Sequence, residues 1–132
     1  MYISEKKIDL NELINQAHHP EAGGIVIFSG ETRNHSNGKK VDYLEYEAHV
    51  EMAEKSIAGI LEEAMRRWPL KKAMAVHRIG RVDISEPAVV VITVSAHRKQ
   101  AYEANIFIID SIKKESPIWK KEFFTDGGAS WG

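Results

Sequence analysis

The stretch "PAVVVITVSA", residues 87–96, constrains the fold more than any other, because it is an almost unbroken run of apolar and β-branched residues. Such a run is typical of a buried strand. A helix is predicted to follow at once, from about 97 to 114. It should end near Glu115, because Ser116 precedes Pro117 and that position disfavours helical backbone. The inward face of this helix has small and aliphatic residues at helical spacing: Ala101, Ala104, Ile108, Ile109 and Ile112.

The rest of the chain divides into similar elements. Two further helices are predicted, one with Asp9 as its N-cap and stopped by Pro20, the other from about Glu51 to Trp68 and ended by Pro69. The segment "GGIVIFSG", residues 23–30, is predicted to be a second buried strand. Other strand patterns occupy 1–4, 41–50, 71–80 and 118–124. The segments 31–40, 81–86 and 125–132 are predicted to be a polar loop, a turn and a glycine-rich terminal turn.

The predicted order of elements is β-α-β-β-α-β-β-α-β. Adjacent strand pairs within 24–48 and 72–95 indicate antiparallel ladders with the helices on one side, which is the α+β class. A chain of 132 residues is long enough to bury one core, and no repeat or linker divides it. Residues 1–132 are therefore predicted to form a single α+β domain.

Composition excludes several classes of function. The formal net charge is −1, with 18 basic and 19 acidic residues, which argues against generic nucleic-acid binding and makes any anion site a local one. Cysteine is absent, so the chain has no disulfide, thiolate metal site or cysteine nucleophile, and any sulfur chemistry needs a partner or a substrate that carries the sulfur. The N-terminal segment lacks an apolar signal core, and no apolar run reaches membrane-spanning length. We expect a cytoplasmic protein without a membrane partner.

The segment "IKKESPIWKKE", residues 112–122, gathers four lysines around a proline and a tryptophan. Lys113 falls in the last turn of the long helix, where the helix dipole favours a cation whatever its role. Lys120 and Lys121 are neighbours on a predicted strand, so their side chains point to opposite faces and only one of them can face inward. A lysine beside apolar walls, such as Trp119, becomes a usable nucleophile or proton donor near neutral pH. The alternative is a solvated lysine face.

Two further clusters are candidate anion sites. His97 and Arg98 lie where a buried strand gives way to a helix, and free N–H groups at a helix start bind anions readily. Equally, Arg98 can be a plain surface residue, with His97 only satisfying the backbone. Arg33 follows a strand and a glycine in a loop that also holds His35 and other basic residues, although polar loops are common.

The spacing of Arg98 and Lys113 constrains any combined site. Fifteen residues of continuous helix separate the two by about 22 Å. They therefore serve different sites, or two chains bring opposite helix ends together in a homodimer with a composite pocket.

The histidines do not indicate a metal site. His18 and His19 are adjacent on a helix and diverge, while His49 and His77 lack a partner at any recognised ligand spacing. His77 is interpreted as a residue at the edge of the core. Neither a Ser-His-Asp arrangement nor a phosphate-binding GK[ST] loop is indicated. The sequence thus predicts no bound metal and no cofactor.

Six segments, followed by "DGGASW", stand in the order and spacing of one family: "FSGETRNH", "LEYEAHVEMAEK", "RRWP", "VHRIG", "SAHRKQAYEA" and "IKKESPIWKKE". From about Gly23 to Trp131 the chain resembles the large, catalytic subunit family of molybdopterin synthases. The resemblance implies a hammerhead-type α+β fold and a central homodimer. It also implies a small ubiquitin-like sulfur-carrier subunit at each end, which makes a heterotetramer. The implied reaction is sulfur transfer from the thiocarboxylated C-terminal glycine of the carrier to cyclic pyranopterin monophosphate, forming the dithiolene of molybdopterin.

The resemblance also implies roles for five residues. Lys113 would activate the thiocarboxylate carbonyl or assist attack, and Lys120 would stabilise developing negative charge. Arg33 would orient the carrier tail or the pterin. His97 and Arg98 would bind the substrate phosphate from the second protomer.

The sequence is also compatible with two other functions. One is a non-catalytic adaptor that binds a ubiquitin-like diglycine tail, and the other is a small phosphate- or nucleotide-binding module. The sequence also departs from the family at its end, where many members continue beyond the equivalent of Trp131 into a charged tail. We expect residues 1–132 to lack whatever such a tail adds to closure of the site.

Overall fold

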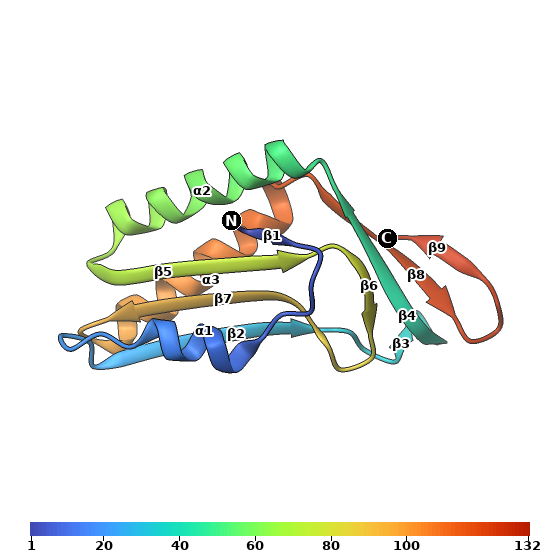
Figure 1. Cartoon of the computed structure of the whole chain (residues 1–132), viewed down its shortest axis with the longest axis horizontal. Coiled ribbons are helices and arrows are strands. Elements are labelled where there is room, and N and C mark those ends of the chain that lie inside the picture. The colour runs from blue at the N-terminus through green and yellow to red at the C-terminus, as the bar shows by residue number, and fades with distance from the viewer.

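A computed structural model describes all of residues 1–132 as three helices and nine strands (Figure 1). The helices are α1 (Leu10–Ala17), α2 (Val50–Arg67) and α3 (Arg98–Glu115). The strands are β1 (Ile3–Ser4), β2 (Gly24–Glu31), β3 (His35–Ser36), β4 (Lys39–Ala48), β5 (Leu70–Arg78), β6 (Gly80–Asp83), β7 (Pro87–Ser95), β8 (Ile118–Phe124) and β9 (Ala129–Trp131). The predicted α+β class is confirmed. None of the helices combines the length and the apolar character needed to cross a bilayer.

Strand β7 is the centre of the first sheet, whose order is β1-β5-β7-β2. It pairs antiparallel with both β2 and β5, and all its residues are buried. Val89 and Val91 belong to the core cluster beneath α2 and α3, whereas Val90, Ile92 and Val94 belong to the cluster beneath α1. An unbroken apolar run is needed because both faces of the strand are covered. The predicted placement of the helices on one side is therefore wrong, since α1 covers the opposite face (Figure 1).

The second sheet has the order β3-β4-β8-β9, with β6 also paired to β4, and it runs obliquely past one end of the first sheet (Figure 1). The expected β5–β7 ladder is confirmed. The expected ladder within 24–48 is wrong, because β2 pairs with β7 and β4 pairs with β8. The bulge at Gly30/Glu31 and the segment that follows take the chain out of the first sheet and into the second.

Three segments that were predicted to be irregular contain short strands. The loop 31–40 includes a hairpin of β3 and β4, whose turn residues Asn37 and Gly38 have φ of 50° and 79°. Asn-Gly is the preferred pair for such a type I′ turn. The segments 81–86 and 125–132 contain β6 and β9. These strands are short and lie against β4 and β8, so no long apolar alternation marks them.

Strand β2 lies at the edge of the first sheet, which contradicts its predicted burial. Ile27 and Phe28 are 39% and 36% exposed, because no further strand or helix covers them in this chain.

The bounds of the helices agree well with prediction. The Asp9 side chain caps α1 by accepting from the Glu12 N–H at 3.1 Å, although the helix ends at Ala17, before Pro20.

Helix α3 has one buried residue that periodicity did not indicate. Asn105 is only 4% exposed, and its side-chain amide donates to the carbonyl oxygens of Val26 at 3.1 Å and Val91 at 3.0 Å. Because the amide is satisfied, its burial is tolerated. Asn105 thus fixes α3 over β2 and β7, and with it the position of both helix ends.

Candidate active site

A cavity of about 480 Å³ lies where the C-terminal end of α3 meets the two sheets. Three of the five predicted site residues line it: Arg33 after β2, Lys113 in α3 and Lys120 in β8. The remaining lining residues are Gly30, Glu31, His35, Leu44, Tyr46, His77, Ala88, Val89, Ile109, Ile112, Ile118, Trp119, Glu122 and Gly132. Three cationic side chains from separate parts of the sequence therefore share one small space.

The register of β4 against β8 decides which lysine faces this cavity. Tyr46 pairs with Lys120 and Leu44 with Glu122, and all four of these residues line the cavity. Lys121 points to the other face, where its Nζ lies 5.3 Å from the ring centroid of Trp131. The predicted division between an inward and an outward lysine is confirmed, with Lys120 as the inward one.

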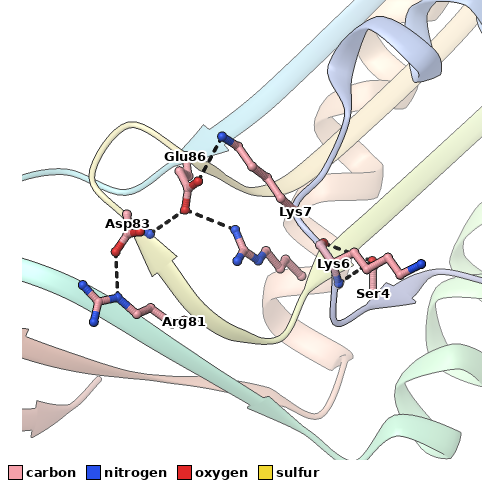
Figure 2. A network of polar contacts seen from close by, with 7 residues as sticks. Ser4, Lys6, Lys7, Arg81, Asp83 and Glu86 are labelled. Atoms are coloured by element: carbon pink, nitrogen blue, oxygen red, sulfur yellow. Dashed lines mark hydrogen bonds and ion pairs between the residues drawn. The ribbon is translucent and has the colours of Figure 1, made fainter.

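The turn between β6 and β7 is held by a network around Glu86 (Figure 2). The Glu86 carboxylate accepts from the Asp83 N–H at 2.9 Å and from Arg78 Nη1 at 3.2 Å, and it lies 3.2 Å from Lys7 Nζ. Hydrogen bonds from the Asp83 N–H and from Lys7 lower the pKa of Glu86.

The same turn is hydrogen bonded to the backbone of Thr32. The Thr32 N–H donates to the Glu86 carbonyl at 3.2 Å, and the Ser85 N–H donates to the Thr32 carbonyl at 2.9 Å. The residue immediately before Arg33 is thus fixed on both sides of its peptide unit. This fixation directs Arg33 to the cavity although the residue itself lies in an exposed connection.

His77, which is interpreted from the sequence as a residue at the edge of the core, lines the cavity. It is 7% exposed, its Nδ1 lies 2.8 Å from the carbonyl oxygen of Arg78, and its ring meets Tyr46 edge-on at a centroid distance of 4.9 Å. Burial, and secondarily the charge of Lys113, lower the pKa of His77, so its ring is neutral at neutral pH. Its position in β5, two residues from Ala75, puts it on the strand face that turns toward α3, but this alternation does not distinguish a core residue from a cavity residue.

Tyr46 has the opposite electrostatic behaviour. Burial, assisted by the carboxylate of Glu122, raises the pKa of Tyr46, so its phenol keeps its proton. The cavity thus combines cationic donors with a neutral imidazole, a neutral phenol and two carboxylates, Glu31 and Glu122. Such a wall can bind anions and hydrogen-bond a polar ring, and its cations can stabilise developing negative charge.

His97 and Arg98 lie away from this cavity, at the N-terminal end of α3. His97 is the N-cap but makes no capping hydrogen bond through its side chain, and both side chains are exposed. The helix is continuous from Arg98 to Glu115, so the separation of about 22 Å from Lys113 stands. One chain does not bring all five predicted residues together, and the composite site stays a prediction.

No group of three His, Cys, Asp or Glu side chains is arranged to hold a metal ion.

Comparison with known proteins agrees with this architecture. A molybdopterin synthase catalytic subunit from Thermoplasma volcanium is 46% identical over 129 residues, which covers 98% of this chain and 94% of that protein. Its counterpart from Halalkalibacterium halodurans is 44% identical, covering 95% and 80% of the two chains. The crystal structure of molybdopterin synthase from Staphylococcus aureus superimposes with a TM-score of 0.93 at 40% identity, covering 99% and 95%.

A second solved structure, the molybdopterin biosynthesis MoaE protein from Burkholderia ambifaria, gives a TM-score of 0.83 at 35% identity and covers 98% of this chain and 86% of that one. The family model for the MoaE protein matches residues 3–115. That range includes Arg33, His97, Arg98 and Lys113 and ends before Lys120. The chain belongs to the MoaE protein family.

Proposed function

We propose that the chain is the catalytic subunit of a molybdopterin synthase. It would transfer sulfur from the thiocarboxylated C-terminal glycine of a small ubiquitin-like carrier to cyclic pyranopterin monophosphate, forming the dithiolene of molybdopterin. The observation that carries this proposal is the convergence of Arg33, Lys113 and Lys120 on one cavity in a chain without cysteine. Family membership and the names of the relatives support it.

The charges of the reactants suit this cavity. A thiocarboxylate and a phosphate are both anionic, and the net charge of the chain is close to zero, so attraction has to come from local cations. The sulfur would arrive on the carrier because this chain has no thiol to relay it.

Each cation has a proposed role. Lys113, in the last turn of α3, would activate the thiocarboxylate carbonyl or assist attack, and Lys120 would stabilise the negative charge that develops. Arg33 would orient the carrier tail or the pterin through the fork of its guanidinium. These three are the groups proposed to touch the reacting molecules within one protomer.

His97 and Arg98 would complete the site from a second protomer and bind the substrate phosphate. Their exposure at the start of α3 leaves them free to do so, and a helix N-terminus favours an anion. The resulting assembly would be a central homodimer with a carrier at each end, a heterotetramer. The cytoplasmic location expected from the sequence stays a prediction, which cell fractionation can test.

A product assay tests the function directly. The purified chain is incubated with thiocarboxylated carrier and cyclic pyranopterin monophosphate, and molybdopterin is quantified. We expect turnover by the wild type and loss of most of it in Lys113→Ala. A chain that binds the carrier normally but makes no dithiolene would be an adaptor for a diglycine tail, and the proposal would be wrong. Tight binding of phosphate or nucleotide without the carrier would instead indicate a small ligand-binding module.

A further inference from the structure

The floor of the cavity is apolar except for one side chain. Among the lining residues the buried ones are Leu44, His77, Ala88, Val89 and Ile112, and His77 is the only polar member of this set. Arg33, Lys113 and Lys120 sit on more exposed parts of the wall. Pockets of this kind bind an apolar or aromatic body against the floor and use a few placed polar groups to fix its orientation.

The hydrogen-bond geometry fixes which nitrogen of His77 is free. The carbonyl oxygen of Arg78 can only accept, so Nδ1 of His77 carries the hydrogen and donates it at 2.8 Å. In a neutral imidazole the other nitrogen, Nε2, is then an acceptor. Nε2 makes no hydrogen bond within the chain, whereas the ring is held in place by the edge-on contact with Tyr46.

The cations of the wall cannot satisfy every polar group of a pterin. Lysine and arginine side chains only donate hydrogen bonds, so they suit phosphate and carbonyl oxygens. A pterin also carries amide N–H and amino groups, which need acceptors when they are buried. Glu31, Glu122 and Tyr46 also offer acceptor oxygens, but these residues are less buried than His77, so Nε2 of His77 belongs to the most buried residue of the lining that has a side-chain acceptor.

We infer that Nε2 of His77 accepts a hydrogen bond from an N–H group of the bound pterin ring, and so determines which edge of the ring enters the cavity. The inference rests on the proposed function and adds a specificity-determining residue to it. A phosphate offers no N–H donor to this atom, so it is directed away from the floor and toward the cationic groups. His77 thus selects a heterocycle with a donor edge over a plain anion.

Charged and titratable groups surround His77 on several elements. Lys113 of α3 and Tyr46 of β4 lie near its ring, Arg78 follows it on β5, and Lys120 and Glu122 of β8 line the same cavity. Its neighbours in the first sheet, Ile3 of β1 and Val89 of β7, carry no charge. Protonation would turn Nε2 into a donor and would remove the proposed contact. Because the pKa of His77 lies below its ordinary value of 6.5, binding should be intact at neutral pH and should weaken as the pH falls through that lowered pKa.

Two substitutions separate the two ring nitrogens. In His77→Asn the amide nitrogen can donate to the Arg78 carbonyl, as Nδ1 does, but the shorter side chain carries no acceptor as far as the position of Nε2. In His77→Gln the longer side chain can place an amide oxygen where Nε2 lies, and that oxygen does not titrate. His18→Gln, an exposed residue at the end of α1 and outside the cavity, is the matched control.

The experiment measures binding of cyclic pyranopterin monophosphate to the full chain by calorimetry across a series of pH values from 7.5 downward, with molybdopterin formation in parallel. We expect His77→Asn to weaken binding about tenfold at pH 7.5 and to raise KM for the pterin while KM for the carrier stays unchanged. His77→Gln should bind within about threefold of the wild type at pH 7.5 and lose the weakening that the wild type shows as the pH falls. His18→Gln should behave as the wild type.

The outcomes distinguish a failure of the role of His77 from a failure of the proposed sulfur-transfer function. If the wild type makes no molybdopterin, the proposed function fails. If the wild type turns over and His77→Asn, folded by circular dichroism, binds the pterin as tightly as the wild type, only the role of His77 is wrong. Should the Asn variant not fold, His77→Gln decides, because an unchanged pH dependence in that variant would also overturn the inference.

Discussion

The hydroxyl groups of Ser56 and Ser116 lie 2.8 Å apart and join α2 to the C-cap of α3 across sixty positions of sequence. Ser116 is 8% exposed, and its N–H also donates to the Ile112 carbonyl at 3.1 Å. Ser116 is three residues from Lys113. The proposed reactive amine therefore projects from a helix end that is hydrogen bonded to α2.

Removing this junction should loosen the end of α3. Ser56→Ala is expected to lower the free energy of unfolding by about 1 kcal/mol, because one partly buried hydrogen bond is lost. Urea denaturation of Ser56→Ala, of Ser116→Ala and of the double variant gives the coupling energy between the two hydroxyl groups. Since both single changes remove the same contact, their effects should not add. Strict additivity would contradict the hydrogen bond.

Lys120 and Lys121 provide a matched pair of adjacent lysines on opposite faces of β8. Lys120→Ala is expected to lower kcat for molybdopterin formation by about a hundredfold, as loss of one charge-stabilising donor does in other enzymes. Lys121→Ala should stay within about twofold, because exposed cation–aromatic contacts are weak. Steady-state kinetics with saturating carrier measures both. Equal losses in the two variants would refute the assignment of Lys120.

The composite site predicts complementation between two damaged protomers. Arg98→Glu and Lys113→Ala should each be nearly inactive, because each removes one component from every site. In mixed dimers one of the two sites would combine an intact Arg98 with an intact Lys113. Random assembly of equal amounts should then restore about a quarter of wild-type activity. A mixture as inactive as its components, or a monomer in sedimentation at micromolar concentration, would show that Arg98 and Lys113 do not meet in a composite site.

His77 should make the fold sensitive to acid. Its pKa in the folded chain is below 6.5, so the unfolded chain binds more protons between the two values. Stability should therefore be fully present above pH 6.5 and should fall as the pH drops through the lowered pKa. His77→Gln should flatten this part of the curve, measured as the free energy of unfolding between pH 7.5 and 5. The control His18→Gln should keep the wild-type slope, and an identical slope in both variants would argue against the buried neutral imidazole.

The sequence predicted the helices better than the sheet pairings. Helical spacing and proline stops located α2 and α3 closely, because both depend on local pattern. The partners of β2 and β4 depend on distant segments, and apolar alternation alone does not tell which strand lies beside which. The exposure of Phe28 was not predicted for the same reason, because a β-branched and aromatic run predicts a strand but not whether that strand lies at the edge or in the centre of a sheet.

The candidate site shows a similar division. Arg33, Lys113 and Lys120 were predicted as separate residues, and the fold brings them to one cavity. The role of His77 was not predicted, because a histidine inside a strand gives no local sign of whether it faces a core or a cavity. Only the packing of β4 and α3 around it places Tyr46 and Lys113 beside its ring.

The unbroken course of α3 has a consequence for how this chain can change. Inserting or deleting a single residue in the middle of the helix would rotate everything beyond it by about 100°. Lys113 would then swing off the cavity, although no residue of the site itself had been altered. The helix tolerates a change of length only in steps close to whole turns. The number of its residues therefore sets the direction in which Lys113 points relative to Arg98.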